Sequence, residues 1–151
     1  MKALFLLSTI FLSGIFTPTH EIPLAVFHIT ASGELLEVDI TFDVEDYSKS
    51  LGITTAEINL EGVQTYLNEK TIFQFNAQVA SLTISEVRIV RDHIKIKGSF
   101  REAIKSIDTI KIENNCLNNI PRHSNVILID LNDDSRDFRM HNKRTVITLN
   151  Y

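Results

Sequence analysis

The chain has 151 residues, of which 15 are Lys or Arg and 19 are Asp or Glu, so its formal net charge is −4. This length suits one domain, because two separate cores would each be small. Apolar residues make up 44% of the chain and charged residues 23%, a composition that excludes disordered and collagen-like proteins. The acidic balance also argues against nucleic-acid binding, which needs basic side chains to neutralise phosphates.

The amino-terminal segment predicts export. Met1 and Lys2 supply a positive charge, and residues 3–16 form a largely apolar run. A membrane-spanning helix needs about 20 residues to cross about 30 Å of hydrocarbon, so this shorter run favours a secretory signal peptide. We predict a signal peptide over 1–19, with cleavage before His20. Cleavage nearer residue 13 or 14 and an uncleaved anchor are the alternatives.

The remainder, 20–151, has 14 basic and 19 acidic side chains, and we expect it to be a single exported domain in the periplasm or at the cell surface. Its one cysteine, Cys116, cannot form an intramolecular disulfide, so the core must stabilise the fold unaided. The whole chain contains 20 Ile, 9 Val and 13 Thr but only 3 Pro and 5 Gly. β-Branched side chains pack well on a pleated surface, and this bias favours strands.

Two strands open the predicted domain. The first covers 24–29 and leads to a polar turn that ends at Gly33. The second, 36–45, alternates with a period of two, which places its apolar side chains on one face of a sheet and acidic side chains on the other. These acidic side chains are Glu37, Asp39, Asp43 and Glu45. We expect the two strands to form a hairpin.

A short helical insertion is predicted near residues 46–69. Residues 46–51 can form one or two helical turns that end near Gly52. Thr54 and Glu57 have the spacing of a capping box, which marks the start of a helix. Apolar residues then recur at helical spacing at Leu60, Val63 and Leu67.

Strands resume after this insertion. They are expected at 71–75, 79–91, 94–100, 107–112, 125–131, 137–141 and 144–151. The alternation within 79–91 changes phase, so we expect a β-bulge near Ser85 and Glu86. Residues 125–131 are apolar at consecutive positions, as in a central strand that is covered on both faces. About eight or nine strands with regular turns predict an all-β fold, mainly an antiparallel β-sandwich.

Three stretches of the sequence carry a family resemblance. They are His20-Glu21 with the following strand 23–29, the acidic strand 35–46, and the segment 110–151. Together they resemble a family of small exported bacterial proteins of unknown function. Its members begin with a histidine and a strand after the signal peptide and close on a terminal hairpin. The resemblance implies a β-rich exported fold with no assigned activity.

A weaker similarity, limited to His20 and residues 42–51, is to extracytoplasmic domains that accompany nickel permeases. Those domains often begin with His-Pro-His, whereas Glu21 and Ile22 follow the histidine here. The similarity implies a metal-binding role for the first histidine.

The residues themselves also suggest a metal site. If cleavage exposes His20 as the first residue, its α-amine and imidazole could chelate Cu(II) or Ni(II), which favour nitrogen ligands. A further ligand could come from His28, His123 or His141. The alternative is that His20 belongs to a frayed terminus and the other histidines lie at the surface.

Two other patterns suggest chemistry. Cys116, His123 and Asp130 are spaced seven residues apart, which fits a nucleophile, a base and an orienting carboxylate, although a lone cysteine is more often a small buried residue. Residues 130–134 begin like a calcium loop but are not followed by the glycine and the final glutamate of that motif. A polar hairpin turn explains the same residues.

The sequence therefore predicts an exported, non-enzymatic β-sandwich that uses no cofactor and binds or supports another component of the bacterial cell envelope. We expect this partner to be another envelope protein. The alternative is an extracytoplasmic Cu or Ni protein that uses His20 and His28. Basic residues near the end of the chain could steer a partner or form an ordinary charged surface. They are Arg136, Arg139, Lys143 and Arg144.

Overall fold

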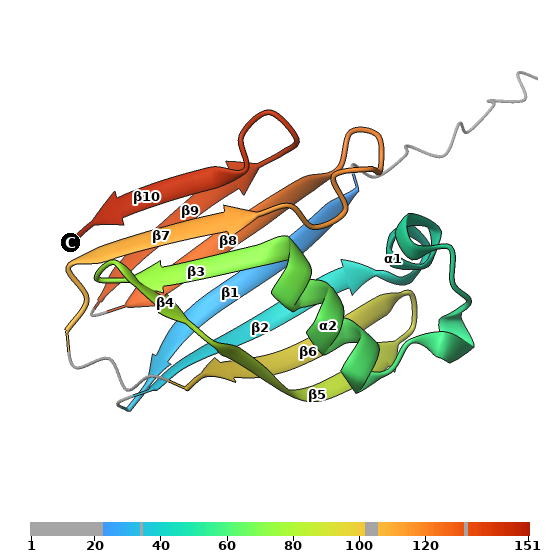
Figure 1. Cartoon of the computed structure of the whole chain (residues 1–151), viewed down its shortest axis with the longest axis horizontal. Helices are drawn as coiled ribbons and strands as arrows, with labels where there is room; N and C mark the ends of the chain where they lie inside the picture. The colour runs from blue at the N-terminus through green and yellow to red at the C-terminus, as the bar shows by residue number, and fades with distance from the viewer. Residues whose placement is uncertain (1–22, 34, 102–105, 132) are drawn as a thin grey trace, which may run out of the picture.

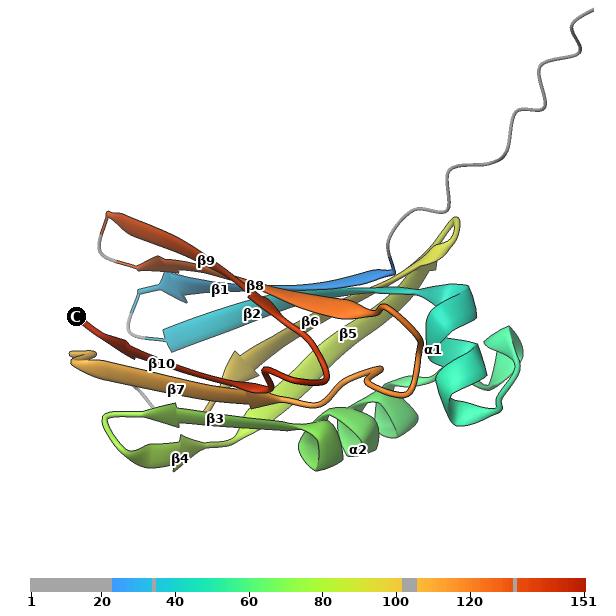
Figure 2. The same ribbon diagram turned by 90° about the horizontal axis from the view of Figure 1, so that it is seen from above.

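The computed structural model describes residues 23–33, 35–101, 106–131 and 133–151. The predicted signal peptide, 1–19, and His20 lie outside these ranges. The described residues form two packed sheets and two short α-helices (Figures 1 and 2), which confirms an all-β fold with a short helical insertion. The strands are β1 (Leu24–Ser32), β2 (Leu35–Asp43), β3 (Thr71–Phe75), β4 (Gln78–Ala80), β5 (Leu82–Val90), β6 (His93–Phe100), β7 (Thr109–Asn114), β8 (Ser124–Leu131), β9 (Asp134–Met140) and β10 (Val146–Asn150).

One sheet has six strands in the order β5-β6-β2-β1-β8-β9, and the other has four in the order β10-β7-β3-β4. Figure 2 shows the two sheets as layers. Neighbouring strands pair antiparallel, except that β1 and β8 pair parallel. This parallel pair joins segments about a hundred residues apart in sequence, so local patterns could not predict it.

The buried apolar side chains form one core between the sheets. In β2, the side chains of Leu36, Val38, Ile40 and Phe42 are at most 3% exposed, whereas Glu37 and Asp39 are exposed on the outer face. The predicted alternation of this strand and its hairpin with β1 are therefore confirmed as far as Asp43. The predicted strand end at 45 is wrong, because Asp43 caps α1 and Glu45 lies in the first turn of that helix. Burial of apolar area at about 25 cal/mol per Å² makes this core the main source of stability in a chain without disulfides.

The structure has ten strands where eight or nine were expected. The difference arises at Ser81, where the predicted strand 79–91 divides into β4 and β5. The chain leaves the four-stranded sheet at this point and enters the six-stranded sheet (Figure 1). The predicted bulge is confirmed, because the pairing of β5 with β6 shifts register between Ile84 and Glu86.

The predicted central strand 125–131 corresponds to β8, which lies between β1 and β9. Its inward side chains, including Ile127 and Ile129, are fully buried. Val126 and Leu128 point to the outer face and are partly exposed. The expectation of cover on both faces is therefore wrong for the described part of the chain, because no second layer lies over this face.

The helical insertion consists of α1 (Val44–Leu51), a 3₁₀ turn (Thr55–Glu57) and α2 (Leu60–Lys70). Helix α1 ends at Gly52, whose φ of 67° is the left-handed conformation that glycine adopts without strain. Thr54 and Glu57 form the predicted capping contact, with the Thr54 N–H donating to Glu57 Oε2 at 2.7 Å. This contact caps the 3₁₀ turn, and Asn59 caps α2 separately. Within the described residues, neither helix is long and apolar enough to span a membrane.

Candidate functional site

The two histidines predicted to bind metal cannot be compared as a pair, because His20 lies outside the described residues. His28 lies on the outer face of β1, and its Nε2 is 2.5 Å from Asp130 Oδ2. Hydrogen bonds from Ser135 and His28 hold the pKa of Asp130 below its usual value. One ring nitrogen of His28 is therefore already paired with a carboxylate.

Among the described residues, one group of three potential metal ligands lies close together: Asp43, Asp92 and His93. This group does not include His28. Asp43 is the N-cap of α1, and its Oδ1 accepts a hydrogen bond from the Asp46 N–H at 3.0 Å. Helix capping accounts for the position of this carboxylate, so we assign no metal centre here.

Cys116, His123 and Asp130 do not form a catalytic group. His123 immediately precedes β8, and seven residues of extended strand separate it from Asp130 by about 23 Å. Cys116 is fully buried, and burial raises the pKa of its thiol well above the usual value. The thiol therefore stays protonated and is a poor nucleophile.

Residues 130 and 134, which begin the calcium-loop pattern in the sequence, are not arranged around a common site. Asp130 and Asp134 lie on opposite faces of the β8–β9 hairpin, because Asp134 pairs with the inward residue Leu131 whereas Asp130 is exposed on the outer face. Asp134 instead accepts a hydrogen bond from Arg136 Nε at 2.8 Å. The hairpin turn that was the alternative explanation agrees with this geometry.

The strongest candidate site lies at the connection between β7 and β8, residues 115–123. The connection is held by the Leu117 N–H, which donates to Tyr66 Oη at 2.8 Å. It is also joined to α1, because Asn119 Nδ2 donates to the Ser50 carbonyl at 3.0 Å. These contacts fix the loop against both helices of the insertion.

The loop ends in a tight turn in which the His123 N–H donates to the Ile120 carbonyl at 3.2 Å. Arg122 occupies the turn position that usually requires glycine or asparagine, and its φ is 62°. A non-glycine residue in this conformation costs about 1 kcal/mol. The turn therefore presents an exposed arginine next to a buried histidine.

A cavity of about 330 Å³ lies between this loop and the connection from β9 to β10. The expected terminal hairpin is not formed, because β9 and β10 belong to different sheets. The two segments lie side by side in Figure 1, where they are orange and red. Among the described residues, the wall of the cavity has two cationic residues, two histidines and no carboxylate. Its lining consists of Asn118, Ile120, Arg122, His123, Ser124, His141, Asn142 and Lys143.

His123 is a buried polar residue in the wall of this cavity, with a side chain only 1% exposed. Its ring nitrogens have no hydrogen bond of good geometry, although an interaction with Asn125 affects its pKa. Nδ1 lies 3.9 Å from Asp46 Oδ2, which is too far for a hydrogen bond. Burial lowers the pKa of His123, while burial and the neighbouring Asp43 and Glu45 raise the pKa of Asp46. Both groups are therefore shifted toward their neutral forms.

Buried polar atoms without partners concentrate in this region. Seven such side-chain atoms occur among the described residues, and six of them belong to α1 or to the segment from the end of β7 to the start of β8. The six are Ser48 Oγ, Asn114 Nδ2, Asn118 Oδ1, Asn125 Oδ1 and both ring nitrogens of His123. Of these residues, Asn118 and His123 line the cavity, and the pKa of His123 also reflects a hydrogen bond with Asn125. Native proteins pair nearly all buried polar groups, so Asn118 and His123 are the side chains here that a ligand in the cavity could complete.

His141 lies on the opposite wall of the cavity and is partly exposed. Its Nδ1 accepts a hydrogen bond from the Lys143 N–H at 3.2 Å. In the neutral ring, the proton is then on Nε2, which is a free donor. The cavity thus combines donors from the β9–β10 connection with a buried imidazole from the β7–β8 connection.

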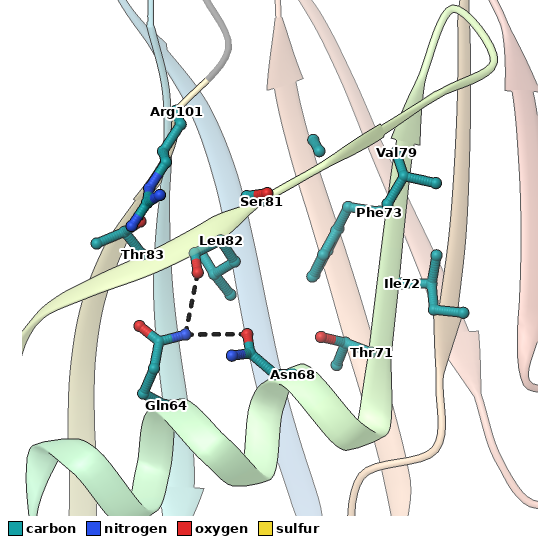
Figure 3. Close-up of a pocket in the computed structure, with 11 residues that line it drawn as sticks. Gln64, Asn68, Thr71, Ile72, Phe73, Val79, Ser81, Leu82, Thr83 and Arg101 are labelled. Atoms are coloured by element: carbon teal, nitrogen blue, oxygen red, sulfur yellow. Dashed lines mark hydrogen bonds between the residues drawn. The ribbon is translucent and has the colours of Figure 1, made fainter.

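Figure 3 shows a different cavity, of about 490 Å³, beside α2 and the crossing from β4 to β5. Its polar side chains are largely engaged within the fold. Gln64 Nε2 donates to the Leu82 carbonyl at 3.0 Å, and Gln64 Oε1 accepts from the Ile84 N–H at 2.7 Å. Arg101 Nε donates to Thr83 Oγ1 at 3.0 Å. These contacts close the free edge of β5, and we interpret this cavity as part of the scaffold.

The sequence suggested His123 as a metal ligand or a catalytic base, His141 as a metal ligand and Lys143 as part of a basic cluster. It did not predict that they share a cavity with Arg122. The available signal was local: each of two polar turns contains a histidine within two residues of a basic residue. Their meeting depends on how β8, β9 and β10 pack, which the turns do not encode.

No protein-family model matches the chain, and the comparison with curated proteins finds no match. The resemblance to small exported bacterial proteins stays a prediction.

Proposed function

We propose that this chain is an exported, non-enzymatic binding module of the bacterial cell envelope, and that the His123 cavity is its binding site. The observation that carries the proposal is the buried side chain of His123 in the wall of a cavity that Arg122 and Lys143 also line. The cavity volume, about 330 Å³, lies in the range of small-molecule sites. Export and the envelope location rest on the signal-peptide pattern of residues 1–19.

The separation of reactive groups supports binding over catalysis. The thiol of Cys116 is buried and protonated, and Asp130 lies far from His123 along β8. Within the cavity wall, the polar groups are donors and imidazoles with no nucleophile that is activated by a base. Such a set recognises a ligand and holds it without a covalent step.

The scaffold also suits a binding role. The cavity is formed by two loops attached to adjacent strands of the six-stranded sheet, β8 and β9. Function often resides on loops that a rigid core positions. Arg122 and Lys143 at the cavity would attract an acidic ligand as it approaches.

Hydrogen exchange on the processed protein tests this proposal. The protein is compared alone and with an extract of envelope components from its native cell. We expect slower exchange in residues 116–125 and 140–145, and no change in β2, which lies away from the cavity. Unchanged exchange in both loops, or protection confined to other elements, would contradict the proposal.

A further inference from the structure

We propose that the group bound in the His123 cavity is a phosphate or another tetrahedral dianion, and that His123 takes up a proton when this group binds. The inference rests on the proposed function and specifies its ligand.

The charge of the cavity favours an anion. Arg122 and Lys143 line it, and no carboxylate of the described part of the chain does. A guanidinium offers paired N–H donors that match phosphate oxygens, and an ammonium adds a mobile positive charge. A divalent metal ion would meet two cations and no acidic ligand at the same place, so the cavity suits anions better than metals.

The number of donors favours a tetrahedral anion over a carboxylate. Around the cavity, His141 offers its Nε2–H, and Asn142 and Ser124 offer an amide and a hydroxyl in addition to the two cations. A carboxylate has two oxygens on one side of its carbon, whereas phosphate and sulfate present acceptors in all directions. Donors from opposite walls of one cavity are better matched by the tetrahedral group.

The place of His123 in the cavity wall, near a carboxylate, connects binding to protonation. From α1, Asp46 faces Nδ1 at 3.9 Å, with Asp43, Glu45 and Lys49 close to that carboxyl. From the two loops, Arg122, His141 and Lys143 line the same cavity. Burial keeps the ring neutral in the free protein, while a hydrogen bond with Asn125 acts in the opposite direction on its pKa. A dianion bound in the cavity favours the imidazolium form, and the proton comes from solvent.

Isothermal titration calorimetry of the processed protein with sulfate, inorganic phosphate and acetate tests the proposal. Sulfate keeps one charge state between about pH 6 and about pH 8, so any pH dependence of its affinity comes from the protein. We expect sulfate to bind about tenfold more tightly at the lower pH, which corresponds to about one unit of change in the pKa of His123. The same titration, repeated in buffers with different ionisation enthalpies, should reveal net proton uptake by the protein on binding.

Three variants test which residues cause the anion binding and the proton uptake. His123→Gln keeps the size and polarity of the side chain and should remove proton uptake, while circular dichroism confirms the fold. Lys143→Met should weaken sulfate and phosphate binding about tenfold. Lys111→Met, on the exposed outer face of β7, is the control and should bind as the unmodified protein does.

The outcomes separate the ligand class from the proposed function. If acetate binds as tightly as sulfate, or if His123→Gln still takes up a proton, the proposal is wrong. If neither sulfate nor phosphate binds while the envelope extract still protects both loops, the ligand class is wrong and the binding function stands. If the extract also gives no protection, both proposals fail.

Discussion

His123 is an ionisable residue held almost entirely out of water without a well-formed hydrogen bond on its ring. A buried imidazole in this state lowers the stability of the free protein, because the unpaired nitrogens have lost their contacts with water. Asp46 is in a similar position, since its pKa is raised by burial and by two acidic neighbours. Two adjacent side chains whose pKa values are both shifted toward the neutral form are typical of functional sites.

The stability of the protein should depend on pH through His123. Its pKa is lowered in the folded chain relative to the usual 6.5, so the unfolded chain binds more protons between the two values. The free energy of unfolding should therefore fall as the pH drops below about 6.5, because the stability contribution present above that pH is lost. Asp46 contributes with the opposite sign at lower pH, where its raised pKa favours the folded state.

Urea unfolding across this pH range measures the effect. His123→Gln should flatten the pH dependence between about pH 5 and pH 7. An unchanged slope in this variant would show that other groups cause the pH dependence and that His123 is not perturbed in the folded chain.

Tyr66 anchors the loop of the site. Its hydroxyl accepts a hydrogen bond from the buried Leu117 N–H, and Leu117 has the unfavourable φ of 54°. Tyr66→Phe should lower the free energy of unfolding by about 1–3 kcal/mol, because a buried N–H loses its partner. Tyr151→Phe removes the same atom from a partly exposed ring and is the matched control, for which urea unfolding should detect no loss.

At the scale of elements, the edge of β5 shows how the sandwich closes. The side chain of Gln64 on α2 pairs with the backbone of Leu82 and Ile84 in the way that a neighbouring strand would. An uncovered strand edge invites pairing with other chains, so this contact also protects the monomer.

Gln64→Ala should therefore lower the free energy of unfolding by about 1–2 kcal/mol and increase self-association on storage. Glu69→Ala changes an exposed residue on the same helix and provides the control. Denaturant unfolding together with light scattering checks both effects. If Gln64→Ala has the same free energy of unfolding as the wild type, water replaces the hydrogen bonds of the glutamine without cost, and the account of this edge is wrong.

Gly98 is required by the close approach of β6 to β5 at the bulge. A Cβ at this position would lie 2.9 Å from the Thr83 carbonyl oxygen and 3.0 Å from the side chains of Leu82 and Ile84. Gly98→Ala should cost about 1–3 kcal/mol through overpacking, whereas Ser99→Ala, one residue further along the strand, should be nearly neutral. Thermal unfolding of both variants measures the difference, and equal melting temperatures would contradict the account.

At the scale of the whole molecule, local patterns predicted much of the fold. The alternation of β2, the end of α1 at Gly52 and the bulge after Ile84 are all encoded within a few residues. The division at Ser81 was missed because β4 and β5 continue one strand-like sequence through the change of sheet. The parallel pairing of β1 with β8 depends on the packing of the complete core and has no local signal.

The candidate site was harder to predict for the same reason. His123 and His141 are separated by the whole β8–β9 hairpin, and each is an ordinary turn histidine in its own segment. Their common cavity is produced by strand order and by the anchoring of the β7–β8 connection on Tyr66 and Ser50. Sequence spacing instead suggested Cys116 and Asp130 as partners of His123. The length of strand β8 separates Asp130 from His123.

The central claim is that the ring of His123 is neutral in the free protein and becomes charged when a ligand fills the cavity. Nitrogen NMR of the imidazole rings near about pH 7, with His123→Gln for assignment, measures this state directly. We predict the neutral pattern for His123 in the free protein and a clear rise in the imidazolium fraction after sulfate is added. A charged ring before addition, or a neutral ring at a sulfate concentration that saturates the calorimetric titration, would contradict the claim.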